Sequence, residues 1–312
     1  CSRSRAHPVS FSAIYILVRA CLSLGFSGFG FVSHDIGGFG GKPSEELYIR
    51  WAQAGLFSSH TRFHGTTPRE PWMFGRRALR IVRDLARTRY RFLPYIYSSA
   101  HDAADGATPL MRPLALAYPR EPLMHHSAAD TEWLLGPDIL VAPFVAPGGE
   151  RDVVLPRGWW REFWTGDVRF GPSVFRESHP LGRFPLYTRV GSVIPLVPAR
   201  ENIEDGPFHD ITWRIDLGHD TMSFEFRDDQ NTDIAIDVEP DGKLGARFAV
   251  RRWRSATAKR FRFETADGSK FDVARIEGAA RHAGYGDVLA EGCFMARLVK
   301  PVGTSVIPSS PV

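Results

Sequence analysis

The first third of the chain alternates between helical apolar faces and short apolar runs that end in polar residues. The spacing predicts a helix over about residues 19–28, ending near two glycines, and then a strand over Phe29–Ser33. An apolar run without alternation is typical of a strand that is covered on both faces in a parallel sheet. A second short extended segment, Leu56–Phe63, closes on a histidine and a glycine.

Two further helices complete this part of the pattern. Ser44 is a candidate cap, because two acidic residues follow it where the helix dipole favours them. Apolar side chains then recur at i, i+4 and i+7: Leu47, Trp51 and Ala54. A long helix is predicted from about Gly75 to His101, kinked at Pro94. Residues 19–101 therefore indicate the tail of a (β/α) barrel or of a doubly wound sheet.

Beyond Gly106 the pattern changes to short β-type runs separated by Pro and Gly. The predicted strands are Ile139–Phe144, Arg151–Leu155, Ser192–Val197, Ile211–Leu217, Met222–Arg227, Asp233–Val238, Arg247–Trp253 and Arg260–Thr265. Strands at such spacing favour β-sandwich modules. A charged break near residues 200–209 divides two of them, and the tail from Pro301 looks loose.

Composition narrows the class of protein. The net charge is +4 with a pI near 9.1, but the positive excess is arginine spread along the chain, so we expect no nucleic-acid partner. Residues 11–31 are apolar, yet Arg19 and three glycines interrupt them, which disfavours a membrane span. Three cysteines without metal-ligand spacing indicate reduced thiols in a cytoplasmic protein. No metal or cofactor is expected.

Four side chains near the ends of the two predicted strands are candidates for binding. Asp35 and His64 follow the strands directly, Phe39 comes after a glycine pair, and Arg62 lies at strand spacing from His64. Glycines would let a ligand approach the backbone, and the phenyl ring offers an apolar face for a sugar. Alternatives remain open for each polar residue: an Asx-turn for Asp35, a structural histidine, and an arginine that extends to solvent.

Several separated blocks carry a resemblance to a known family. They occur in order as GFSGFGFVSHDIGGF, RWAQAGLFSSHTRFHG, RFLPYIY, PLMRPL, WLLGPDILVAPF, PRGWWREFWTG and PLYTRVGSVIPL. This set resembles glycoside hydrolase family 31, the α-glucosidases and α-xylosidases, over about residues 19–200. The SHDIGGF motif is more similar to that of the α-xylosidase branch than to that of animal-type α-glucosidases.

The resemblance implies an architecture and a binding role for the candidates. Residues 19–106 would be the C-terminal part of a (β/α)8 barrel, with its last two strands and their helices. Residues 107–200 and 201–312 would be a proximal and a distal β-sandwich domain, and 1–18 an atypical N-terminal segment. In the family, the residues matching Asp35 and Phe39 line the sugar subsite and the match to His64 hydrogen-bonds sugar hydroxyls. We include Arg62 among the substrate-binding residues.

The chemistry implied by the resemblance needs more than these residues. Retaining glycosidases use two carboxylates about 5 Å apart. In the family these follow the fourth and sixth barrel strands, so we assign no catalytic residue here and expect both upstream.

Because the chain starts with Cys1 rather than Met, we expect a truncated piece. Residues 1–18 do not resemble the family's acid/base segment, so we expect a foreign or frame-shifted start. The expected substrate is an α-linked oligosaccharide or aryl glycoside, and an oligomer is possible for the full-length enzyme. The alternative is a non-catalytic carbohydrate-binding or inactive fragment.

Overall fold

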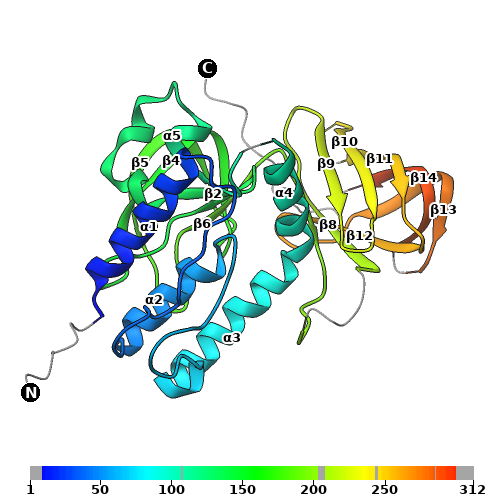
Figure 1. Cartoon of the computed structure of the whole chain (residues 1–312). Helices are drawn as coiled ribbons and strands as arrows, with labels where there is room; N and C mark the ends of the chain where they lie inside the picture. The colour runs from blue at the N-terminus through cyan, green and yellow to red at the C-terminus, as the bar shows by residue number, and fades with distance from the viewer. Residues whose placement is uncertain (1–8, 107, 203–207, 243–244, 285, 300–312) are drawn as a thin grey trace, which may run out of the picture. The chain divides into compact units, whose positions relative to one another are not determined.

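The structure, a computed structural model, describes residues 9–106, 108–202, 208–242, 245–284 and 286–299. The chain divides into two compact units, which Figure 1 traces along the sequence. The first comprises the residues up to Arg89 together with Asp102–Thr165 and Arg169–Thr188. The second comprises Tyr90–His101, Gly166–Val168 and the residues from Arg189 onward. The predicted loose tail and part of the predicted break near 200–209 lie outside the described residues.

Helices dominate the first hundred residues. They are α1 (Phe11–Phe26), α2 (Glu45–Leu56), α3 (Arg76–Arg91) and α4 (Leu93–Gly106), with the short α5 (Leu114–Ala117) and the 3-10 turns η1 (Pro71–Phe74), η2 (Pro122–His125) and η3 (Ser127–Thr131). The predicted cap of α2 is confirmed, because the Ser44 hydroxyl accepts a hydrogen bond from the Leu47 N–H at 3.3 Å.

Two helix predictions are corrected. The helix predicted over 19–28 begins at Phe11, because its buried face already starts at Ile14 and Val18 and continues in helical register. The segment predicted as atypical is therefore helical from Phe11, while residues 1–8 lie outside the described residues. The single helix predicted over 75–101 is two, α3 and α4, separated at Phe92. Pro94 causes the break, because it lacks an N–H and restricts the residue before it.

The two strands predicted before the candidate residues are also corrected. Residues 29–33 and 56–63 form no ladder, and the described residues contain one isolated parallel bridge between Asp35 and Arg62. Instead of a neighbouring strand, the Ser59 hydroxyl pairs with both backbone groups of Val32, at 3.1 and 3.0 Å. A strand is defined by its hydrogen-bonded partners, so an apolar run alone does not establish one.

A buried arginine replaces that missing ladder at the end of α2. Arg89 on α3 is only 9% exposed, and its guanidinium donates to the carbonyl oxygens of Leu56, Ser58 and Ser59 at 2.7–2.9 Å. Carbonyls at a helix C-terminus have no partner within the helix, so a cation that reaches them satisfies several at once. Arg89 therefore fixes the segment that leads toward Arg62.

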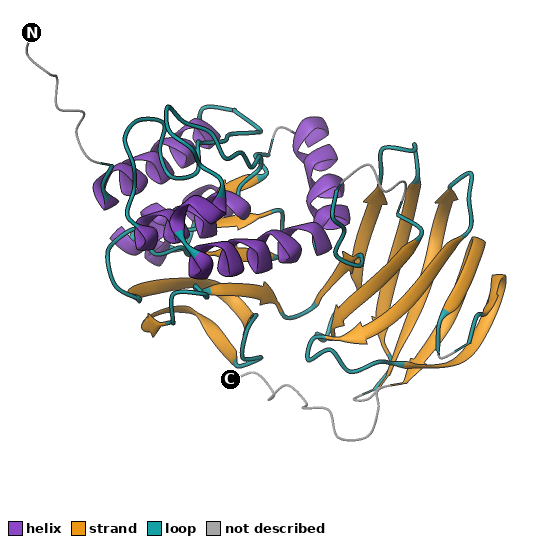
Figure 2. Ribbon diagram, turned by 90° about the horizontal axis from the view of Figure 1, so that it is seen from below, coloured by secondary structure: helices purple, strands orange, loops and turns teal. Residues whose placement is uncertain are grey.

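The rest of the first unit contains a six-stranded sheet. Its strands are β1 (Met111–Pro113), β2 (Trp133–Leu135), β3 (Ile139–Val141), β4 (Glu150–Glu162), β5 (Val168–Ser178) and β6 (Leu186–Arg189), in the order β1-β2-β3-β6-β4-β5. Figure 2 shows the helices of this unit gathered on one side of these strands. Apolar side chains such as Leu134, Leu140 and Trp160 form its core.

The second unit is built on an eight-stranded sheet. Its strands are β7 (Ser192–Leu196), β8 (Asp210–Asp216), β9 (Met222–Arg227), β10 (Asp233–Pro240), β11 (Gly245–Arg254), β12 (Lys259–Thr265), β13 (Asp272–His282) and β14 (Val288–Val299). The order is β7-β8-β12-β14-β11-β10-β9, and β13 pairs with β14. The sheet curves so that β7 and β9 come into contact. Trp213 lies at the centre of its aromatic core, with four phenylalanine rings 5.4–6.3 Å from its ring.

All eight strands predicted beyond Gly106 correspond to strands of these sheets, and the architecture fits a barrel tail followed by β-sandwich domains. The division into domains differs in detail from the one we expected. Strand β7 pairs with β8 in the larger sheet, so the change from one sheet to the other falls between Arg189 and Ser192 rather than at residue 200. Residues 90–101, expected with the barrel tail, belong to the second unit.

The Arg89 contacts predict a large cost for Arg89→Ala. The substitution leaves three buried carbonyl oxygens without their charged donor, so we expect the free energy of unfolding to fall by about 2–4 kcal/mol. Urea unfolding followed by tryptophan fluorescence measures this change. Arg87→Ala, at an exposed position of the same helix, is the matched control and should change stability by less than about 0.5 kcal/mol. Equal effects of the two substitutions would contradict the role given to Arg89.

Candidate functional site

The isolated bridge between Asp35 and Arg62 brings two loops of the first unit together. The Ile36 N–H donates to the Arg62 carbonyl at 3.1 Å, and the Arg62 Nε lies 2.5 Å from Asp35 Oδ1. The carboxylate is 12% exposed and the guanidinium 60% exposed. Oδ1 accepts no aligned hydrogen bond within the described residues. The carboxylate is thus charge-paired but keeps acceptor capacity.

The other two predicted residues form a second contact across the same two loops. The rings of Phe39 and His64 lie 5.6 Å apart at an interplanar angle of 49°. Phe39 is 57% exposed, so its ring is accessible from solvent. The structure therefore brings all four predicted residues together as two pairs, Asp35 with Arg62 and Phe39 with His64. Their role in binding a sugar stays a prediction.

A buried arginine holds the two loops against each other. Arg69 is 3% exposed; its Nε and Nη2 donate to the Gly38 carbonyl at 3.0 and 2.6 Å, and Nη2 also donates to the Gly41 carbonyl at 2.8 Å. Its Nη1 donates to the carbonyl and hydroxyl oxygens of Thr67. Burial lowers the pKa of Arg69. The guanidinium thus fixes the loop between Asp35 and Phe39 to the segment after His64.

Close packing against Arg69 requires glycine in both loops. Gly37 has φ +87°, and a Cβ there would lie 3.0 Å from the Arg69 Cδ. A Cβ on Gly65 would lie 2.9 Å from both the Arg69 Cζ and the Phe39 carbonyl oxygen. The glycines after Asp35 therefore meet a steric requirement of the loop itself, which is a different reason from the ligand approach that we predicted.

Helix α2 supports the loops through Trp51 and Tyr48. The Trp51 Nε1 donates to the Nδ1 of His34 at 3.1 Å, and the Tyr48 hydroxyl donates to the Arg69 carbonyl at 2.6 Å. His34 is 5% exposed, and burial lowers its pKa to about 4. The imidazole is therefore neutral at pH 7, with Nδ1 as acceptor.

Sequence reasoning missed the residues that position the site. Arg69 lies in a loop, where no periodicity marks it as buried, and arginine is among the residues least often buried. For His34 the only signal was its place between the apolar run and Asp35, and Trp51 was assigned to the inner face of its helix without a partner. The resemblance identified the candidate binding residues, but the residues that position them, Arg69, Trp51 and His34, were not predicted to do so.

The chemistry available here is that of neutral polyol binding. A carboxylate accepts bonds from adjacent hydroxyls, an imidazole donates or accepts, and an exposed ring packs against C–H faces. An open depression of about 340 Å³ lies along residues 63–70 and includes His64. Within the residues that the structure describes, no three His, Cys, Asp or Glu side chains could hold a metal ion together. None of the described helices is long and apolar enough to cross a membrane.

Comparison with protein families assigns both halves of the matched region to one family. The model described as "Glycosyl hydrolases family 31 TIM-barrel domain" matches residues 8–99, and the "Glycosyl hydrolase family 31 C-terminal domain" matches residues 107–194. Together they match more than half of the chain.

Curated relatives agree. Alpha-glucosidase 2 of Bacillus thermoamyloliquefaciens is 35% identical over 188 residues, and the alignment covers 59% of this chain and 24% of the relative. Alpha-xylosidase XylQ of Lactiplantibacillus pentosus is 41% identical over 191 residues, covering 57% of this chain and 24% of the relative. The chain thus spans about a quarter of the length of these relatives.

Solved structures show the same fold. A dextranase of this family from Flavobacterium johnsoniae, complexed with glucose, aligns with a TM-score of 0.79 at 22% identity, covering 95% of this chain and 44% of that one. An α-xylosidase of this family from a soil metagenome, complexed with xylose, aligns with a TM-score of 0.55 at 30% identity, covering 58% of this chain and 30% of that one.

The packing around Gly37 predicts that Gly37→Ala destabilises the chain by about 1–3 kcal/mol, because the left-handed backbone and the contact with Arg69 both disfavour a Cβ. Gly40→Ala is the matched control in the same loop. A Cβ at Gly40 would point into open space, with none of the described residues beyond its chain neighbours within 4 Å, and its φ is not left-handed. We expect the control to change stability by less than about 0.5 kcal/mol. Chemical denaturation of both variants measures the difference, and equal values would refute the packing argument.

The buried neutral His34 predicts a pH-dependent stability. Its folded pKa of about 4 lies below the ordinary value of 6.5, so the unfolded chain binds more protons between these values. This contribution is complete above pH 6.5 and is lost as the pH falls toward 4. Between pH 7 and pH 5 it amounts to about 2 kcal/mol.

The test compares urea unfolding at both pH values in the native chain and in His34→Gln, which keeps an acceptor for Trp51. The variant should lose about that much less stability on acidification. His60→Gln, at an exposed position, should behave like the native chain. An unchanged pH dependence in His34→Gln would rule out a neutral buried imidazole.

Proposed function

The chain belongs to glycosyl hydrolase family 31, and on this basis we propose that it contributes part of the sugar-binding subsite of a retaining α-glycosidase. The proposed reaction is hydrolysis of terminal α-O-glycosidic bonds in α-xylosides, and in α-glucosides as a second substrate class. The named relatives include both α-glucosidases and α-xylosidases, which supports this pair of substrates.

The observation that carries the proposal is the pairing of Asp35 with Arg62 and of Phe39 with His64 across two loops that Arg69 holds together. In the proposed complex the Asp35 carboxylate accepts hydrogen bonds from two adjacent sugar hydroxyls. Arg62 pairs with that carboxylate and orients it. His64 hydrogen-bonds a further hydroxyl, and Phe39 packs against the ring.

The proposal separates binding from bond cleavage. A retaining mechanism needs a nucleophile and an acid/base about 5 Å apart. We assign neither role within residues 1–312 and propose that barrel segments outside this sequence supply both. Asp35 then acts by binding, through hydroxyl contacts that strengthen in the transition state.

We further propose a cytoplasmic location for the chain. Among the described residues, Cys21 is buried and Cys293 is exposed, and both are free thiols. Unpaired cysteines are more common in reducing compartments. Fractionation of the source cells, followed by detection of the chain, tests this location.

The proposed subsite predicts that the 312-residue chain binds xylose weakly and does not release p-nitrophenol from p-nitrophenyl α-xyloside. Titration with xylose, followed by NMR or calorimetry, measures the binding. Asp35→Asn should weaken it at least about tenfold because a neutral amide oxygen is a weaker acceptor than a carboxylate, and His64→Gln should do so because it replaces the imidazole that packs on the Phe39 ring.

His60→Gln, an exposed histidine four residues from His64, is the matched control and should bind as the native chain does. Unchanged affinity in both Asp35→Asn and His64→Gln would reject the subsite assignment. Turnover of the aryl glycoside by the purified chain would show instead that the catalytic pair lies within these residues.

A further inference from the structure

Three arginines of the second unit lie in one row across neighbouring strands. In the sheet register, Arg247 on β11 is opposite Arg297 on β14, and Arg297 is opposite Arg275 on β13. Side chains directly opposite each other have Cβ atoms about 4.5–5.5 Å apart, and like charges at such positions destabilise a sheet. The row therefore gathers three guanidinium groups, with their N–H donors, at a structural cost.

Among the described residues, each of the three arginines has one carboxylate beside it, so the charges of the row are balanced one to one, while most of the guanidinium N–H groups keep no carboxylate acceptor. Arg247 pairs with Glu239 at 3.1 Å, Arg297 with Asp241 at 3.2 Å, and Arg275 with Glu277 at 2.8 Å: these are the contacts between oppositely charged groups around the row. The guanidinium groups are 60–75% exposed, so such pairs contribute little to stability. Each guanidinium carries five N–H groups, and one carboxylate leaves most of them unused.

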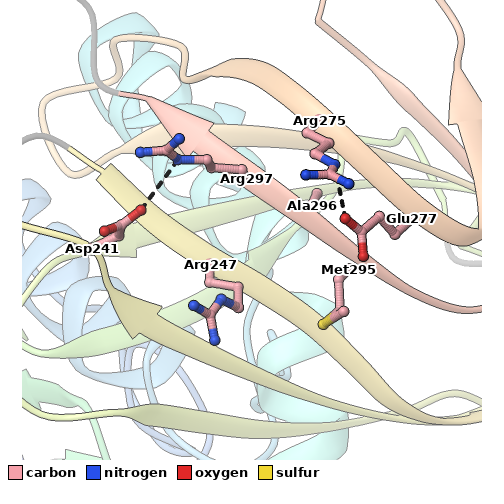
Figure 3. A pocket seen from close by; sticks show the side chains of 7 residues that line it. All are labelled: Asp241, Arg247, Arg275, Glu277, Met295, Ala296 and Arg297. Atoms are coloured by element: carbon pink, nitrogen blue, oxygen red, sulfur yellow. Dashed lines mark hydrogen bonds and ion pairs between the residues drawn. The ribbon is translucent and has the colours of Figure 1, made fainter.

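The row borders a hollow on the surface of the sheet, shown in Figure 3. The hollow has a volume of about 380 Å³, at the lower end of the range for small-molecule sites. Figure 3 shows the three guanidinium groups around it, with Asp241 on one side and Glu277 on the other, next to Met295. Met295 is 44% exposed and offers an apolar contact within a charged surface.

We propose that this hollow binds a saccharide that carries an oxyanion group, a carboxylate or a sulfate ester. The guanidinium fork matches the geometry of such a group and can hold it by two parallel hydrogen bonds. Asp241 and Glu277 accept bonds from hydroxyls, which a bare inorganic anion could not donate. Met295 packs against the C–H face of the ring. The choice of a saccharide rests on the proposed function, whereas the choice of an anion rests on the arginine row.

The test titrates the 312-residue chain with D-glucuronate, glucose 6-sulfate, glucose and inorganic sulfate, followed by NMR of the arginine side chains. Both acidic sugars should bind more tightly than glucose and more tightly than inorganic sulfate. Arg297→Gln and Arg275→Gln should each weaken binding of the acidic sugars at least about tenfold. Arg281→Gln is the matched control, because Arg281 lies on the same strand as Arg275, is 67% exposed and pairs with one carboxylate.

Three outcomes would overturn the proposal. Glucose binding as tightly as the acidic sugars would remove the need for an anion, and inorganic sulfate binding as tightly would remove the need for a saccharide. Equal losses in Arg297→Gln and Arg281→Gln would show a non-specific charge effect. The Asp35→Asn variant distinguishes this site from the subsite in the first unit, since it should keep its affinity for glucuronate while losing that for xylose.

Discussion

Buried guanidinium groups that donate to loop carbonyls hold the first unit together where a sheet ladder is missing. Arg69 joins the loop after Asp35 to the segment after His64, and Arg89 closes the end of α2. Arg50 on α2, 2% exposed, donates to the carbonyls of Gly148 and Arg183. A planar cation with five donors satisfies several carbonyls from one position, and this allows irregular backbone to be buried.

This arrangement makes α2 the element on which the candidate site depends. One face of the helix carries Trp51, which orients His34, and Tyr48, which fixes the Arg69 carbonyl. Another face carries Arg50. Its guanidinium lies 4.3 Å from the centre of the Phe144 ring, and burial lowers the pKa of Arg50 to about 10. At that pKa it remains charged at neutral pH. A single helix thus anchors the loops of the candidate site and the loops of the smaller sheet.

The sequence predicted those local features that follow from residue periodicity or from chemically distinctive residues. The cap of α2 and the strands beyond Gly106 follow from local rules, whereas the kink expected at Pro94 is a break between two helices. The four candidates were chosen by their places near the ends of the predicted strands, and the family resemblance implied a role for Asp35, Phe39 and His64. The strand over 29–33 was wrong because the backbone groups of Val32 pair with the Ser59 hydroxyl and the Gly30 carbonyl accepts from the Leu110 N–H, so no ladder forms in this part of the described chain. Arg69 could not be found, because its burial results from the tertiary contact of two loops and has no local pattern.

The arginines also explain why the net charge by itself was a poor guide. The arginines are spread along the sequence, and from this we expected only that the chain has no nucleic-acid partner. In the fold, arginines have two different roles. In the first unit, Arg50, Arg69 and Arg89 are buried and their donors are directed to carbonyl oxygens, so they stabilise irregular backbone. In the second unit, Arg247, Arg275 and Arg297 are exposed, and cross-strand register gathers residues that are far apart in sequence. The proposed recognition of a charged ligand therefore depends on the strand register, which neither composition nor linear spacing reveals.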